Sequence, residues 1–165
     1  MIFIIPSFLG CRQKPRQSSQ LPVKFDPKLS AEERMESLYQ LGVIAGTTGK
    51  LDLAEQQFRL VLKDNPKHLE ANHDLGLVFA RKGQIRQAIE YFQRSLEINP
   101  NFPEAYFNLA ISYHNMGQLE MGEGYLDRTL ELDPTHKKAL IAKARLAMRR
   151  GQMRTATKLY AHYVK

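Results

Sequence analysis

Residues 69–102 read LEANHDLGLVFARKGQIRQAIEYFQRSLEINPNF, and the pattern of this stretch recurs along the chain every 34 residues. It contains Leu75-Gly76, Gly83, Ala88, Phe92 and Pro100. The same or similar residue types lie one period earlier at Leu41, Gly42, Gly49, Ala54, Phe58 and Pro66, and one period later at Leu109, Ala110, Gly117, Leu126 and Pro134. A fourth copy carries Ala144, Gly151, Ala156 and Tyr160. A fixed period in this range predicts stacked units, each burying its apolar face against its neighbours.

This pattern resembles the tetratricopeptide repeat (TPR) family, whose motif of Leu-Gly, Ala, an aromatic residue and Pro has this length. The resemblance covers residues 35–165. It departs at the family's tryptophan position, which holds Leu38, Asn72, Tyr106 and Leu140, and at Gly122, which replaces an alanine. It implies an all-α fold, an alpha-alpha superhelix of about three and a half helical hairpins. A TPR domain over 30–165 would contain repeats 35–68, 69–102 and 103–136 and a partial capping repeat 137–165.

Local signals predict two antiparallel helices in each repeat. We expect A helices over 31–48, 68–82, 102–116 and 136–150, and B helices over 51–64, 85–98, 119–132 and 152–164. Gly49 and its equivalents lie where each A helix should end in a left-handed residue. Each of the first three B helices should end at an Asn-Pro or Asp-Pro pair, because proline disfavours helical geometry in the residue before it. Ser30 and Glu33 predict a capping box at the start of the first helix.

The period assigns seven apolar residues to the contacts between helices: Leu41, Leu75, Leu109, Ala54, Ala88, Phe58 and Phe92. Small residues at the eighth and twentieth repeat positions allow helices to approach closely, and Gly122 meets that need. Gly124 has no such role, and a glycine inside a helix costs about 1 kcal/mol relative to alanine. We therefore expect the helix over 119–132 to be the least stable.

The N-terminal segment contains Cys11, the single cysteine of the chain, so no intrachain disulfide is possible. Cys11 follows Gly10 and a largely apolar run, an arrangement that resembles the end of a bacterial lipoprotein signal. Residues 1–11 would be a truncated signal with Cys11 as the lipidated residue, and the basic stretch 12–29 a flexible tether. This interpretation predicts a lipid-anchored protein of the bacterial cell envelope. The alternative is a cytoplasmic protein with an unstructured N-terminus.

No catalytic or metal-binding pattern is present in the sequence. Gly46-Thr-Thr-Gly-Lys50 imitates a phosphate-binding loop, but Ile44 and Leu51 break the motif. The histidines, at positions 68, 73, 114, 136 and 162, lack the spacing that puts two metal ligands on one helical face, so we interpret them as surface or groove residues. We predict a non-catalytic protein that needs no cofactor and no metal.

In the TPR family, fixed A-helix positions line a concave peptide-binding groove. Carried over residue by residue, the resemblance assigns to this groove Glu36, Tyr39, Gln40, Val43, Glu70, His73, Asp74, Leu77, Glu104, Phe107, Asn108, Ile111, Lys138, Arg145 and Arg149. Asn108 is the first candidate for bonding a ligand backbone and Gln40 the second, because an amide side chain both donates and accepts hydrogen bonds. The family's carboxylate-clamp subclass is disfavoured, since Tyr39, Val43 and Glu104 occupy clamp positions.

Charge is distributed unevenly along the chain, whose formal net charge is +7. Residues 1–31 carry +4, the third repeat −5 and residues 137–165 +9. Within the predicted groove, repeats one to three are acidic and the fourth is basic, because acidic residues (Glu36, Glu70, Asp74 and Glu104) give way to basic ones (Lys138, Arg145 and Arg149). We expect a scaffold or adaptor that binds a protein partner, as an extended peptide or a helix, in the assembly of an envelope complex. The basic fourth repeat is interpreted as a polar cap; binding of an anionic surface or nucleic acid is the alternative.

Overall fold

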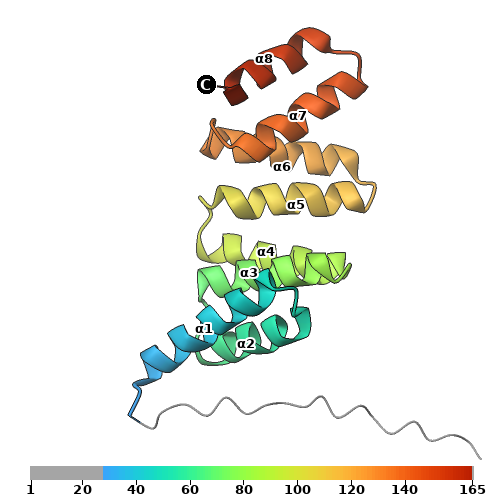
Figure 1. The fold of residues 1–165 in the computed structure, drawn as a ribbon. Helices are drawn as coiled ribbons and strands as arrows, with labels where there is room; N and C mark the ends of the chain where they lie inside the picture. The colour runs from blue at the N-terminus through green and yellow to red at the C-terminus, as the bar shows by residue number, and fades with distance from the viewer. Residues whose placement is uncertain (1–27, 165) are drawn as a thin grey trace, which may run out of the picture.

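The computed structural model describes residues 28–164, which form eight α-helices and no strand. The helices are α1 (Ala31–Thr47), α2 (Leu51–Asp64), α3 (Leu69–Arg81), α4 (Ile85–Ile98), α5 (Pro103–Asn115), α6 (Leu119–Leu132), α7 (Lys137–Arg149) and α8 (Met153–Val164). Consecutive helices pair as hairpins, and the hairpins stack one upon another (Figure 1). The predicted alpha-alpha superhelix is confirmed, and every helix end lies within one residue of its predicted position.

Glycine with positive φ reverses the chain inside every hairpin. The φ angles are 79° at Gly49, 75° at Gly83, 77° at Gly117 and 72° at Gly151. Residues with a β-carbon are strained in this region of backbone space. The predicted left-handed end of each A helix is therefore confirmed, and Gly46–Lys50 is part of such a turn.

Between repeats, one side-chain hydrogen bond recurs at the residue before proline. A side-chain oxygen of Asn65 accepts from the Lys67 amide at 3.1 Å, and the equivalent oxygens of Asn99 and Asp133 accept from backbone amides two residues on, at 3.0 and 2.9 Å. These bonds form Asx turns, which compete with helical geometry. The first three B helices end at these pairs, as predicted.

Three of the four A helices, α1, α3 and α7, start with a side-chain cap, and the caps are of two kinds. At α1, the hydroxyl of Ser30 accepts from the Glu33 amide at 3.1 Å, and the Glu33 carboxylate accepts from the Ser30 amide at 2.7 Å, which confirms the capping box. At α3 and α7, the Nδ1 atoms of His68 and His136 accept from the amides of Ala71 and Ala139 at 3.3 and 3.2 Å. The interpretation of these two histidines as surface or groove residues was incomplete, because their rings satisfy helix N-termini.

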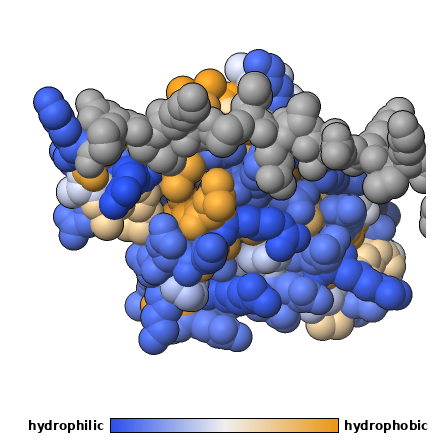
Figure 2. All heavy atoms as spheres, turned by 90° about the horizontal axis from the view of Figure 1, so that it is seen from below, coloured by the Kyte–Doolittle hydropathy of each residue, from blue (hydrophilic) through white to orange (hydrophobic). Residues whose placement is uncertain are grey.

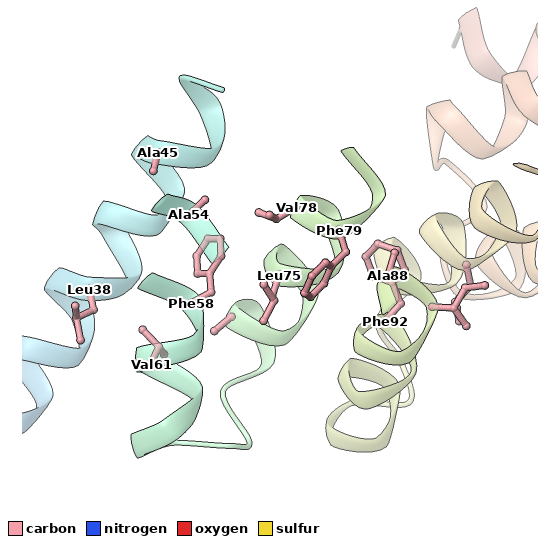
Figure 3. Packing of buried hydrophobic residues seen from close by; sticks show 13 residues of the cluster. Leu38, Ala45, Ala54, Phe58, Val61, Leu75, Val78, Phe79, Ala88 and Phe92 are labelled. Atoms are coloured by element: carbon pink, nitrogen blue, oxygen red, sulfur yellow. The ribbon is translucent and has the colours of Figure 1, made fainter. Parts of the chain in front are cut away.

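The apolar core runs through the stacked hairpins. Six of the seven residues predicted to lie between helices are at most 2% exposed, and Figure 3 shows Phe58, Leu75 and Phe92 among them. Leu41 is the exception, because it stays partly exposed on α1, which has no described helix stacked against its outer side. A second, smaller cluster joins Ala110, Leu126 and Ala139. The core is thus divided within the third repeat.

Close helix contacts explain the small residues of the motif. A β-carbon added to Gly76 would lie 2.6 Å from the ring of Phe92, and one on Gly42 would lie 2.7 Å from Phe58. At Gly122, an added β-carbon would lie 2.9 Å from the carbonyl oxygen of Ala110. Gly122 therefore does permit close approach, as predicted, whereas Gly124 has open space around it.

Viewed from the first-repeat end of the stack, the surface is mostly hydrophilic, with smaller hydrophobic areas (Figure 2). Among residues 28–164, no helix combines the length and apolar character that crossing a membrane requires. Cys11, the predicted signal over 1–11 and most of the predicted tether lie outside the described residues.

Candidate functional site: the face of the A helices

The A helices α1, α3, α5 and α7 form one side of the stack, which we call the A face. Neighbouring members α1 and α3, and likewise α3 and α5, contact each other directly. All fifteen residues assigned to the groove lie on these four helices, and each of them keeps part of its surface exposed. The assigned residues are therefore placed where a ligand could reach them.

Four of the assigned residues form a hydrogen-bonded network across three A helices. The hydroxyl of Tyr39 on α1 donates to Oδ2 of Asp74 on α3 at 3.0 Å. Nδ1 of His73 lies 3.3 Å from Oδ1 of Asp74, and its Nε2 lies 2.8 Å from Nδ2 of Asn108 on α5. Burial, together with the nearby carboxylate of Asp74, raises the pKa of Tyr39 well above its ordinary value, so the phenol stays protonated and donates.

The network determines which side-chain atoms are still able to form a hydrogen bond with a ligand. A carboxylate only accepts hydrogen bonds, so in a neutral His73 ring we expect the proton on Nδ1 and a hydrogen bond from the Asn108 amide to Nε2. Among the described residues, the side-chain oxygen of Asn108 has no hydrogen-bond partner, so it can accept a hydrogen bond from a ligand. Gln40, the second candidate, donates from Nε2 to Glu36 at 2.7 Å within α1.

Tyr39, His73 and Phe107 occupy the same groove position in repeats one to three, and each packs against another ring. Each of these rings packs on the ring that directly precedes the next A helix: Tyr39 on His68, His73 on Phe102 and Phe107 on His136, with centroid distances of 5.1, 5.0 and 5.1 Å. These contacts connect the A face to the loops between repeats, where the partner rings lie. Such packing limits the freedom of these side chains before a ligand binds.

A first pocket, of about 210 Å³, opens on the A face between repeats one and two. It is mainly apolar and is lined by Val43, Gly46, Thr47, Phe58, Asp74, Leu77, Val78 and Arg81. The guanidinium of Arg81 donates to the carbonyl oxygen of Gly46 across the pocket mouth. Arg81 thus links the two A helices that form the pocket.

A second pocket, of about 170 Å³, lies between repeats three and four. Its lining is Ala110, Ile111, His114, Leu119, Gly122, Glu123, Leu126, Ala142, Arg145, Leu146 and Arg149. Ile111 and Leu119 are 38% and 43% exposed, so part of this apolar lining faces solvent. The packing of α6 against α7 is looser than that of α2 against α3 or α4 against α5, and this leaves the space.

Charge on the fourth repeat is only partly neutralised by the third. Lys143 pairs with Asp127, and Arg150 pairs with Glu123 at 2.7 Å, so acidic residues of repeat three bind two cations of repeat four. Over the described residues, six other cations of this repeat have neither an ion pair nor a hydrogen bond from their side chains: Lys137, Lys138, Arg145, Arg149, Arg154 and Lys158. Three of the six, Lys138, Arg145 and Arg149, are groove positions.

No cluster of three or more potential metal ligands occurs between residues 28 and 164. Glu104 and Lys138 are exposed and take part in none of the contacts described above. The A face offers hydrogen-bonding groups, apolar pockets and charged side chains, which are the means of binding a ligand.

Two family models match the chain. A tetratricopeptide repeat model matches residues 36–68 and 103–136, and a TPR repeat model matches residues 76–117. The chain belongs to the TPR family. TPR proteins act as scaffolds for protein–protein interaction and are generally non-catalytic. No curated protein sequence matches the chain significantly.

Solved structures with the same TPR architecture include several MamA proteins. A crystal structure of MamA aligns with a TM-score of 0.71 at 20% identity, over 81% of this chain and 78% of that one. MamA from Desulfovibrio magneticus RS-1 aligns with a TM-score of 0.68 at 26% identity, over 79% and 73% of the two chains. YrrB, described as a TPR protein with an unusual peptide-binding site, aligns with a TM-score of 0.64 at 25% identity, over 67% and 57%.

Several features of the site are absent from the sequence-based prediction. The two pockets require knowledge of how closely neighbouring hairpins pack. Asn72, at the family's tryptophan position, is buried and donates to the carbonyl oxygens of Pro66 and His68 at 3.0 and 2.9 Å. The sequence shows that this position varies, because Tyr106 takes the place of Asn72 in the next repeat. It does not show that Asn72 binds the backbone of the loop before α3.

Proposed function

We propose that this TPR protein is a non-catalytic scaffold that binds a segment of another protein along the A face. The network from Tyr39 to Asn108 carries the proposal, because it holds polar groups of three successive repeats in place and leaves a hydrogen-bond acceptor toward the ligand. Preorganised side chains lose less entropy when a ligand binds. The similarity to YrrB, described as having an unusual peptide-binding site, supports the same function.

The groove is further proposed to select partners by charge. Glu36, Glu70 and Glu104 are exposed at equivalent positions of repeats one to three, and Lys138 occupies that position in repeat four. A partner segment with basic residues toward the first repeats and acidic residues toward the fourth would match this distribution. Complementary charge mainly sets specificity and association rate.

Reversal of the three glutamates to lysine tests this charge selection. Their side chains have no role in the apolar core, so the triple variant should fold. It should capture a different set of partners from cell extract than the unaltered protein does. Reversal of Glu90, Glu97 and Glu131, which lie exposed on α4 and α6, is the matched control. Identical partner profiles for all three proteins would contradict the proposal.

The cellular role that we propose is assembly of a bacterial envelope complex, with the scaffold anchored through a lipid on Cys11. The motif around Gly10-Cys11 is the support for this proposal. Mass spectrometry of the native N-terminus tests it: residues 1–10 should be absent and Cys11 should carry an acyl group. An N-terminus that retains these residues and an unmodified Cys11 would favour the cytoplasmic adaptor instead.

A second candidate function is binding of an anionic surface by repeat four. The six cations of α7 and α8 that have no ion pair within the described part of the chain favour it. Because such binding depends on charge, its affinity should fall steeply between low and moderate salt. Vesicles with and without anionic lipid, together with a duplex oligonucleotide, are the probes. Equal binding to neutral and anionic vesicles, or none to any probe, would dismiss this candidate.

A further inference from the structure

The two pockets of the A face are equivalent positions of the repeat. Val43, Phe58 and Arg81 of the first pocket correspond, exactly two repeats later, to Ile111, Leu126 and Arg149 of the second. The same architecture therefore creates two apolar recesses on one surface. At one equivalent lining position, Gly46 of the first pocket is replaced by His114 of the second. The difference in formal charge lies at two others, where Asp74 and Leu77 of the first pocket are replaced by Ala142 and Arg145 of the second.

This replacement changes the charge of the second pocket. It removes a carboxylate and adds a guanidinium, so Arg145 and Arg149 both stand at an apolar recess. Both are exposed, and neither has an ion pair or hydrogen bond within the described residues. The one carboxylate in the lining, Glu123, is already paired with Arg150 at 2.7 Å. The second pocket is thus apolar inside and positively charged at its mouth.

We propose that the partner of the A face is an extended acidic–apolar segment. One large apolar side chain fills the first pocket, a second fills the second pocket, and carboxylates next to the second bind Arg145 and Arg149. The proposal rests on the groove function proposed above and names the chemistry of its ligand. Side-chain carboxylates fit better than a single chain terminus, because Lys138 adds a third unpaired cation in the groove of the same repeat.

The geometry favours an extended ligand over a helix. Asn108 lies on α5, between the residues of the first pocket and the arginines of the second. Its side-chain oxygen has no hydrogen-bond partner within residues 28–164 and can accept a backbone N–H. The N–H groups of a helix are already bonded internally, whereas those of an extended chain are available. Helices pack roughly 10 Å apart, so the two pockets are separated by roughly 20 Å. An extended chain covers that span in about six residues.

The test uses the full chain and a displayed library of random 12-residue peptides. Enriched peptides should carry two large apolar residues about six positions apart, with Asp or Glu within two residues of one of them. Arg145→Glu/Arg149→Glu should weaken the binding of such a peptide at least about tenfold, and the remaining affinity should depend less on salt. Arg154→Glu/Lys158→Glu makes the same charge change on α8, outside both pockets, and should alter affinity by less than about twofold.

A variant of the first pocket tests the other half of the proposal. Gly46 lies in this pocket within α1, and a β-carbon there would meet only Ala54 Cβ, at 3.9 Å. Gly46→Met should therefore fill the recess without disturbing the fold. Peptides selected against this variant should keep the acidic–apolar pair and lose the preference for the distant apolar residue.

The outcomes separate this inference from the groove function itself. Enriched peptides that compete for the A face, yet show no acidic–apolar pair or bind the Arg145→Glu/Arg149→Glu variant equally well, would overturn the inference and leave the groove function standing. Failure to enrich any peptide would count against both. If the charge-reversed variant does not fold by circular dichroism, Arg145→Gln/Arg149→Gln replaces it, and unchanged affinity for that variant would overturn the inference as well.

Discussion

The side-chain amide of Asn108 donates to Nε2 of His73 over 2.8 Å, and this bond joins the third repeat to the second. His73 in turn lies 3.3 Å from Asp74, which accepts from Tyr39 of the first repeat. The polar groups at the centre of the A face are therefore ordered by one another. A ligand meets a fixed pattern of donors and acceptors in place of independent side chains.

The tautomer of His73 is the first prediction. Because the Asp74 carboxylate can only accept, the neutral ring of His73 should carry its proton on Nδ1. Nitrogen chemical shifts of ¹⁵N-labelled protein near neutral pH measure the tautomer directly, and His73→Gln assigns the signals. A proton found on Nε2 would mean that Asn108 presents its oxygen to the ring and its amide to the ligand.

Two glycines of α6 should respond in opposite directions to the same substitution. An alanine β-carbon at Gly124 has nothing within 4 Å, so Gly124→Ala should stabilise the protein by about 1 kcal/mol through helix propensity. Gly122→Ala would place its β-carbon 2.9 Å from the Ala110 carbonyl oxygen and should destabilise the protein. Urea denaturation of both variants measures the two effects. A gain in stability from Gly122→Ala would contradict the described contact between α5 and α6.

Replacement of Gln57 by an apolar residue of similar shape should stabilise the protein. It is 1% exposed, and its side-chain oxygen has no hydrogen-bond partner among the described residues. A buried polar atom without a partner costs roughly 1–3 kcal/mol, so Gln57→Met, which keeps the shape of the side chain, should raise the free energy of unfolding by a similar amount. Gln56→Met, at the less buried neighbouring position, is the control. Thermal denaturation that shows no gain for Gln57→Met would indicate that a water molecule satisfies the oxygen.

An ion pair between the first two repeats should make stability depend on pH. Lys82 Nζ lies 2.7 Å from both Asp52 and Glu55. Burial acts to raise the pKa of Glu55, but hydrogen bonds from Lys82 and Arg59 outweigh it and lower the pKa below 4.5. A lowered pKa in the folded state contributes stability above the unfolded value, and that contribution is lost as pH falls through the folded pKa.

The measurement compares the unaltered protein with Glu55→Gln by urea denaturation near neutral pH and in acid. The difference between their free energies of unfolding should be largest near neutral pH and should shrink below about pH 4.5. Glu90→Gln, an exposed substitution on α4, should show no comparable trend. A difference that stays constant across this range would show that Glu55 contributes through packing alone.

The period of the sequence predicted the architecture well because its signals are local. A positive φ at Gly83 or an Asx turn at Asn99 depends on a few neighbouring residues, and so does the start of α1 at Ser30. For the site, the sequence could predict only which residues of the A helices belong to it, and not the contacts between them. That Asn108 bonds His73, or that Arg145 is unpaired while Arg150 binds Glu123, depends on side chains from other helices, and one sequence does not contain those distances.

The proposed function requires that the A face, and no other surface, receive the partner polypeptide. Addition of a library-selected peptide to ¹⁵N-labelled protein measures this directly through changes in amide chemical shifts. We expect the largest changes on α1, α3, α5 and α7, around Asn108 and the two pockets. Changes concentrated on α2, α4, α6 and α8, with the amides of the A helices unaffected, would contradict it.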